Sequence, residues 1–406
     1  MKDPEKLKRS LSLPLITFYG LGTILGAGIY VLIGEVAAEA GFHAPLSFLL
    51  ASFIAGFSAF SFAELSSRYP KSAGPALYMH SAFGFQLLST VVGILVISIG
   101  VISAAAISKG FTGYLHVFFD FPDWLAISGI VISLGLIAIW GINESVFTIS
   151  LMTTIELLGL LIIIWIGKDS LLLLPERMPE MLPPSDLREW PTIFSGAILA
   201  FYAFIGFEDM VSVAEEIKEP KKNLPRAIII SLFVTTFLYI TIALIAILAM
   251  PIDQLAGSHA PLAMLYQYKT GSPPTLITLI SLFAVINGAL VQIIMGSRVL
   301  YGLSSQGWLP AAIGKIHPRT RTPVRATLLL TAIILVMALW LPLVTLARIT
   351  SLITLAVFAC INAALLVIKR REGTPMGVQT YPGWIPLAGL FTSSLIIFLE
   401  LMRFLP

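Results

Sequence analysis

Charged residues are scarce in this sequence. Only 12% of its 406 residues are charged and 57% are hydrophobic, whereas an ordinary soluble domain carries about 25% charged residues. The charges gather in short segments, and the stretches between them reach about 20 residues, the length that a helix needs to cross a bilayer. This pattern is incompatible with the charged surface of a soluble protein and predicts an all-α membrane protein. The net charge of +3 adds little, and we expect no nucleic-acid partner.

Cysteine, histidine and several catalytic motifs are also missing or rare. The single cysteine, Cys360, lies in an apolar run, so no disulfide framework is possible. The five histidines are scattered and no HExxH motif is present, so no metal site is expected. The absence of a phosphate-binding loop, G-x-x-x-x-G-K-[ST], argues against an ATP-driven pump, and no filter loop or ring of charges indicates a channel. We therefore expect neither a cofactor nor an enzymatic activity.

Long apolar runs make up most of the sequence, and they predict eleven membrane spans. Their limits are 13–38, 44–67, 85–110, 123–141, 146–167, 192–214, 226–250, 274–303, 324–343, 347–369 and 383–404. The segment 168–191 is rich in proline and charge, which bars a buried helix, so it divides the chain into two halves. With the N-terminus inside, 18 of the 25 lysines and arginines fall on the cytoplasmic side, as expected for cytoplasmic segments.

Glycine interrupts two of these spans near the middle. The first contains Gly26, Ala27 and Gly28 in the run LGTILGAGIYVLIG, and the sixth contains Gly206 in AFYAFIGFEDMVSVAEE. Glycine is a poor helix former, and unpaired backbone at bilayer depth is tolerated only where it lines a cavity or is buried in protein. Paired broken spans in corresponding positions are typical of the binding site of a secondary transporter.

The order of the spans predicts an internal symmetry. The broken first span starts inside and the broken sixth span starts outside, so residues 13–167 and 192–369 would form inverted repeats related by an axis in the membrane plane. The last span, 383–404, would lie outside the repeats. The whole chain, 1–406, is expected to form a single transmembrane domain.

Several segments resemble one family. They are GLGTILGAGIYVLIGEVAAEAG, FAELSSRYPKSAGPALYMHSAFG, GINESVFTISLMTTIELLGLL, AFYAFIGFEDMVSVAEEIKEPKKNLPRAI and SRVLYGLSSQGWLP followed by KIHPRTRTPVRA. In this order they resemble the amino acid–polyamine–organocation superfamily over most of residues 10–370. The resemblance implies a five-plus-five inverted-repeat bundle of the leucine-transporter type, with discontinuous first and sixth helices. It also implies alternating-access transport of amino acids or related amines.

The two breaks define a candidate site for an amino acid. The N–H groups of Ala27, Gly28 and Ile29 would bind its carboxylate at the positive end of a helix. The freed carbonyls that would face its ammonium are those of Ile24, Tyr202 and Ile205, and the breaks themselves add Gly26 and Gly206. In the resembling family, the corresponding backbone positions bind these two groups. The alternative interpretation is that the glycines only let two helices pack closely.

Side chains in the apolar spans add further candidates, because polar groups there must find partners. Tyr202 stands where the resembling transporters place an aromatic residue that closes over the substrate, although simple packing is the alternative. Gln292 corresponds to a substrate-lining position of the family. Ser103 and Asn287 are also polar, and a helix–helix hydrogen bond is the competing explanation for Ser103.

Acidic residues within spans are candidates for proton coupling. Glu208 follows the second break and is next to Asp209; it could carry a proton, or it could brace the broken helix by accepting backbone N–H groups. Glu156 lies in the fifth span, where some proton-coupled members of the superfamily have a lysine. Glu64, near the end of the second span, is expected to hold nearby loops in place.

The sequence therefore favours an amino acid permease, proton-coupled or exchanging, with a neutral substrate. Its membrane would be the inner or plasma membrane, with the N-terminus cytoplasmic. The expected partners are an amino acid, protons and membrane lipid. Two alternatives stay open: a transporter of cationic amino acids or polyamines with a glutamate as counter-charge, and a membrane sensor derived from a transporter fold. Symport and antiport are not distinguished.

Overall fold

The computed structural model describes residues 9–71, 74–140, 146–305, 307 and 309–403. Its elements in this part of the chain are helices, as the composition predicted. They are α1 (Leu13–Leu25), α2 (Ala27–Ala40), η1 (Gly41–His43), α3 (Ala44–Arg68), α4 (Gly74–Phe83), α5 (Gln86–Leu115), α6 (Asp123–Trp140), α7 (Val146–Gly167), η2 (Lys168–Leu173), α8 (Leu174–Met181), α9 (Trp190–Tyr202), η3 (Phe207–Glu216), α10 (Pro220–Ala249), α11 (Ile252–Ala256), α12 (Pro261–Thr270), α13 (Thr275–Ser305), α14 (Val324–Trp340), α15 (Leu343–Glu372) and α16 (Trp384–Arg403).

Long apolar helices occupy the regions of the predicted spans. Within the described residues, nine helical segments are apolar and long enough to cross a bilayer, and α1 and α14 are shorter apolar helices. Each predicted span overlaps at least one of these segments or shorter helices; the segment Gly28–Arg68 overlaps the first two spans, and α5 continues past its predicted limit to Leu115. The number of spans that cross the membrane remains a prediction.

The helical geometry changes at both glycine-rich positions. Helix α1 ends at Leu25 and α2 begins at Ala27, with Gly26 between them. Helix α9 ends at Tyr202, a turn follows through Gly206, and the chain continues as the 3₁₀ helix η3. Because 3₁₀ runs longer than four residues are uncommon and often mark functional hinges, the ten residues of η3 set this segment apart from the regular helices.

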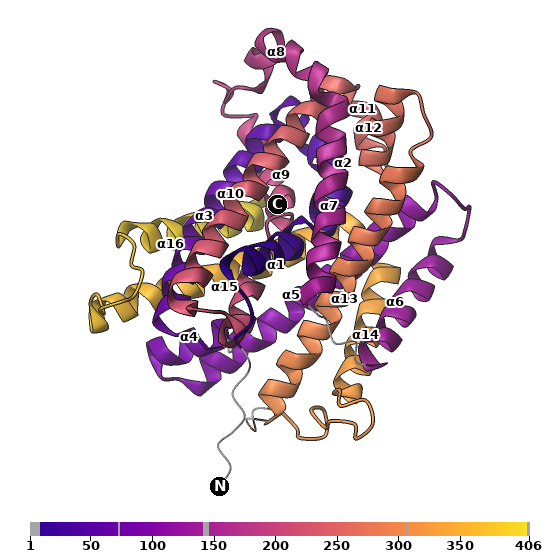
Figure 1. Ribbon diagram of the computed structural model, residues 1–406. Coiled ribbons are helices and arrows are strands. Elements are labelled where there is room, and N and C mark those ends of the chain that lie inside the picture. The colour runs from indigo at the N-terminus through magenta and orange to yellow at the C-terminus, as the bar shows by residue number, and fades with distance from the viewer. Residues whose placement is uncertain (1–8, 72–73, 141–145, 306, 308, 404–406) are drawn as a thin grey trace.

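The broken segments lie in the middle of the bundle (Figure 1). Helix α1 packs against α7 and α10, and α9 packs against α2, α3 and α15, while α5 packs against α13 and α15. A group of aromatic rings fills part of the interior: Phe62 lies edge-to-face on Phe207 and Phe358, which also contact each other. Apolar helices therefore surround the two breaks, where backbone polar groups are left without helical partners.

Short helices lie at the two ends of the bundle. Helices α8, α11 and α12 lie at one end, and α4 lies toward the opposite end (Figure 1). These helices have ten residues or fewer, so a search for membrane-length apolar runs does not detect them. Helix α8 falls in the divider 168–191, and most of its residues are exposed or half-buried, consistent with the expectation that no buried helix forms there.

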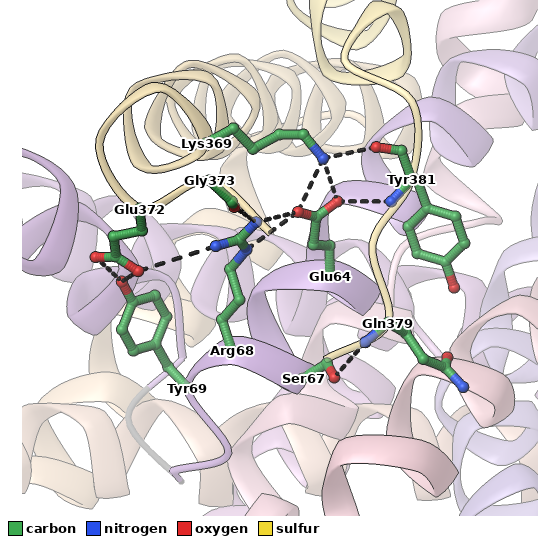
Figure 2. Close-up of polar contacts among 9 residues, drawn as sticks. All are labelled: Glu64, Ser67, Arg68, Tyr69, Lys369, Glu372, Gly373, Gln379 and Tyr381. Atoms are coloured by element: carbon green, nitrogen blue, oxygen red, sulfur yellow. Dashed lines mark hydrogen bonds and ion pairs between the residues drawn. The ribbon is translucent and has the colours of Figure 1, made fainter. Parts of the chain in front are cut away.

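A buried ionic cluster holds α3, α15 and the segment before α16 together (Figure 2). Glu64 is fully buried, and its carboxylate accepts hydrogen bonds from Arg68, Lys369 and the backbone N–H of Tyr381. Arg68 also donates to the carbonyl of Gly373. Two cations and a backbone donor therefore compensate the one buried carboxylate, which gives Glu64 the structural role that the sequence indicated.

The same cluster changes the acidity of a neighbouring tyrosine. The Tyr69 hydroxyl is hydrogen-bonded to the carboxylate of Glu372. Partial burial, together with this hydrogen bond and the negative charge of Glu372, raises the pKa of Tyr69 to about 12. The phenol therefore stays protonated, and remains a hydrogen-bond donor, throughout the physiological pH range.

Candidate functional site

The two breaks pack directly against each other. A Cβ atom placed on Gly28 would lie 2.5 Å from the Cα of Ala203, and one on Gly206 would lie 2.3 Å from the carbonyl oxygen of Thr23. Gly206 also has a φ of 130°, a conformation that strongly favours glycine. Close approach of two backbones therefore requires glycine at both positions.

Tyr239 of α10 bridges the two breaks. Its side chain is fully buried, and its hydroxyl oxygen lies 2.8 Å from the carbonyl oxygen of Ile24 and 3.0 Å from that of Ala203. A phenol has a single proton, so it donates to one of the two carbonyls at a time. Both carbonyls belong to helix ends created by the breaks, so this one residue stabilises the two ends together.

A cavity lies where the breaks meet, and most of the predicted binding residues line it. They come from α1, α2, α5, α9, the turn after α9 and α13: Ile24, Gly26, Gly28, Ser103, Tyr202, Ile205 and Gln292. Two predicted residues do not: Ile29 is fully buried in the apolar core, and Gly206 packs against Thr23 instead. The side chain of Ala27 lies outside the described part of the structure.

The cavity also has walls that the sequence interpretation missed. These residues are Tyr19, Gly22, Thr23, Ile107, Asp209, Gly288 and Val291, while Asn287 had been noted only as a polar residue. Helical spacing gives a signal for several of them, since residues four apart share a face. Ile107 lies four residues after Ser103, Thr23 four after Tyr19, and Gln292 four after Gly288. Asp209 gives no such signal, because it belongs to the 3₁₀ segment.

Tyr202 and Ser103 form a contact across the cavity wall. The two hydroxyl oxygens are 2.9 Å apart, and the Tyr202 hydroxyl lies 3.2 Å from the carbonyl oxygen of Ser103. Both side chains are buried and both line the cavity. The helix–helix hydrogen bond expected for Ser103 is therefore present, and it holds the aromatic ring of Tyr202 at the edge of the cavity.

Glu156 lies behind the cavity wall. Its Oε1 accepts a hydrogen bond of 3.0 Å from the amide of Asn287, which does line the cavity. The Glu156 side chain is fully buried, and its Oε2 has no hydrogen-bond partner among the described residues. Tyr30 of α2 donates to the backbone carbonyl of Glu156, so this residue contacts α13 through its carboxyl group and α2 through its backbone.

Glu208 and Asp209 have different surroundings although they are adjacent. The Oε2 of Glu208 accepts a 2.8 Å hydrogen bond from the backbone N–H of Gly206, which is the bracing contact considered for it. Both residues line a second cavity that shares Ile205, Asp209 and Gln292 with the first. The second cavity continues between α4, α5, α13 and α15, toward the end of the bundle that carries α4.

The backbone groups at the breaks have the chemistry to bind a zwitterion. Ala27, Gly28 and Ile29 are the first residues of α2, and the first N–H groups of a helix have no partner within it. Two of the carbonyls expected to face an ammonium already accept one bond: that of Ile24 from Tyr239, and that of Tyr202 from the N–H of Ile205. Each carbonyl oxygen can still accept a second hydrogen bond. Within the described residues, no group of three or more histidine, cysteine or acidic side chains could hold a metal.

Comparison with known proteins decides the family. The family described as amino acid permease matches residues 11–406. The chain belongs to the amino acid permease family. It is therefore a multi-pass membrane transporter of the leucine-transporter fold rather than an enzyme, which confirms the resemblance found in the sequence.

The names of proteins similar to this permease state different substrates. A branched-chain amino acid permease of Bacillus subtilis is 29% identical over 99% of this chain and 91% of its own length. A vacuolar cationic amino acid transporter 2 of Arabidopsis thaliana is 28% identical over 90% of this chain and 60% of its own length. A methylthioribose transporter of Bacillus subtilis is 28% identical over 91% of this chain and 83% of its own length. Membership of the family leaves the substrate class of this permease open between neutral and cationic amino acids.

Proposed function

We propose that this permease transports amino acids with neutral, branched side chains by alternating access, using the cavity between the two breaks as its binding site. The observation that carries this proposal is the composition of the cavity. It combines the first turn of α2 with an aliphatic wall of Ile107, Ile205 and Val291. The charged groups of a zwitterion need the free N–H groups in the first turn of α2. A branched hydrocarbon side chain fits the aliphatic wall, because removing apolar surface from water is favourable.

In this proposal the substrate carboxylate binds the N–H groups at the start of α2, where the helix dipole favours negative charge. The ammonium faces the carbonyls at the ends of α1 and α9. Tyr202, held by Ser103, closes over the substrate from the side. The two proposed repeats, 13–167 and 192–369, would then rock around this site, as in other inverted-repeat transporters.

The proposed location is the inner or plasma membrane with a cytoplasmic N-terminus. The unequal distribution of lysine and arginine supports this orientation. The second cavity would then lead from the substrate site toward the cytoplasm, because it extends toward α4, which follows the predicted second span on its cytoplasmic side. Transport coupled to a cation, or exchange of one amino acid for another, is consistent with this arrangement.

A cationic substrate is the second candidate, and one observation favours it. Asp209 lines the cavity, whereas the preference for a neutral substrate assumed no facing carboxylate other than Glu208 and Glu156. A lysine or arginine side chain could pair with this carboxylate. A cationic relative such as that of Arabidopsis thaliana adds support for this candidate.

Counterflow in proteoliposomes distinguishes the candidates. Vesicles holding the purified permease and unlabelled leucine are diluted into labelled leucine, and leucine, valine, lysine, arginine, putrescine and methylthioribose compete from outside. We expect leucine and valine to suppress uptake of the label and the cations to have little effect. Stronger competition by lysine or arginine would favour the second candidate, and failure of every amino acid to exchange would contradict the proposal.

A further inference from the structure

Asp209 is an unpaired carboxylate between two cavities. It lines both the cavity at the breaks and the second cavity toward α4, and in the described part of the chain its carboxylate has no hydrogen-bond or ion-pair partner. Its neighbour Glu208 lines only the second cavity and is fixed by the N–H of Gly206. The two adjacent acids therefore differ in the property that matters for binding a cation: one carboxylate is occupied by the backbone, and the other is free.

Among the residues that the structure describes, no lysine, arginine or histidine lines either of these cavities. The ionisable residues that line either cavity are Tyr19, Tyr202, Glu208 and Asp209. The segment η3 packs against α1, α3, α4 and α10, whose described ionisable residues are Tyr19, Glu64, Arg68, Tyr78, His80, Lys221, Lys222, Arg226 and Tyr239. Of these only Tyr19 shares a cavity with Asp209, while Glu64 and Arg68 are paired with each other in the cluster of Figure 2.

An ionised carboxylate without a partner at this depth is costly. Asp209 lies in the apolar segment Trp190–Glu216. Its carboxylate is therefore stabilised by a bound cation, and losing that cation is unfavourable unless water hydrates the carboxylate instead. A small cation on Asp209 would neutralise the cavity when the zwitterion enters. When the second cavity opens to water, the carboxylate is hydrated and the cation leaves.

We propose that Asp209 binds the small cation, a proton or a sodium ion, that crosses the membrane together with the amino acid, and that Glu208 is a positioning residue that fixes the second break. This inference rests on the proposed function, since it assigns the coupling step of that transport. It also transfers the coupling role from Glu208 and Glu156, the residues that the sequence indicated, to a residue that contacts the substrate cavity directly.

The test compares exchange with accumulation in proteoliposomes, using leucine as the probe. Exchange is measured by counterflow without any ion gradient. Accumulation is measured separately under an inward proton gradient and an inward sodium gradient, so that the wild-type protein identifies its cation. The variants are Asp209→Asn and, as the adjacent acid, Glu208→Gln. Thermal unfolding in detergent checks the folding of each, and Asp209→Ser repeats the test should the Asn variant unfold.

Because Asp209 also lines the substrate cavity, we expect Asp209→Asn to lower leucine exchange to some extent, but to lower accumulation above equilibrium by a much larger factor under the effective gradient. Glu208→Gln should lower exchange and accumulation by the same factor, because it weakens the break and spares the cation site. The inference is overturned if folded Asp209→Asn accumulates leucine like the wild type, if its exchange and accumulation fall by the same factor, or if only Glu208→Gln uncouples transport. It is also overturned if the wild type exchanges leucine but responds to neither gradient, whereas a wild type that exchanges no amino acid contradicts the proposed function itself.

Discussion

At the scale of single residues, Gly28 and Gly206 are important because they have no side chain. At Gly28 and Gly206 the facing atoms belong to the backbone of the other break, so they cannot move aside as a flexible side chain would. The sequence pattern suggested that glycine opens the helices; the structure adds that glycine also lets the two opened segments touch. The first property follows from propensity, while the second depends on tertiary packing and is not visible in the sequence.

Replacing Gly28 by valine should therefore abolish transport. The added Cβ would lie 2.5 Å from the Cα of Ala203, so the breaks must separate, and overpacking of this kind typically costs about 1–3 kcal/mol. The matched control is Gly129→Val on α6, where a Cβ meets no atom of the described residues within 4 Å. Leucine counterflow and thermal unfolding of both variants measure the effect. Wild-type counterflow by the Gly28 variant would show that the close contact is dispensable.

At the scale of elements, Tyr239 joins two helix ends that the sequence analysis treated separately. Its hydroxyl lies within hydrogen-bond distance of the carbonyls of Ile24 and Ala203, so α10 holds α1 and the turn after α9 in one arrangement. Buried polar groups that lose a partner are destabilising. The bridge therefore contributes both to stability and to the shape of the cavity.

Removing that hydroxyl with Tyr239→Phe should lower stability by about 1–3 kcal/mol, because a buried carbonyl loses its donor. Leucine counterflow should fall as well, since the two ends are no longer held together. The comparison is Tyr268→Phe on α12, whose side chain is 52% exposed. Denaturant unfolding in detergent measures both proteins. Equal unfolding midpoints for the two variants would contradict the bridging role.

Helix positions were more predictable than the contacts between helices. Hydropathy located the regions of α3, α6, α7 and α16 within a few residues, because membrane length and apolar composition are properties of the chain itself. It missed α4 and α12, which are too short to produce such a signal. Ile29 was assigned to the site for its backbone N–H; its side chain lies in the apolar core, and the assignment of the N–H stays a prediction.

At the scale of the whole molecule, the site depends on segments from both halves of the chain. The cavity combines α1, α2 and α5 with α9, η3 and α13. The paired glycine breaks led to α1, α2 and α9, and the family resemblance led to Gln292 on α13. Asp209 and Tyr239 could not be assigned, because their roles depend on which carboxylate stays unpaired and which hydroxyl meets two ends after folding.

If an amino acid binds in the cavity between the breaks, a variant that fills this cavity should lose transport. In Val291→Trp, the indole would occupy space at the cavity wall, whereas Val336→Trp places the same ring on α14 at a side chain that is 50% exposed. Labelled-leucine counterflow is measured for both proteins after thermal unfolding confirms that they are folded. We expect counterflow to be lost in Val291→Trp and retained in Val336→Trp; wild-type counterflow by folded Val291→Trp would show that the amino acid binds elsewhere.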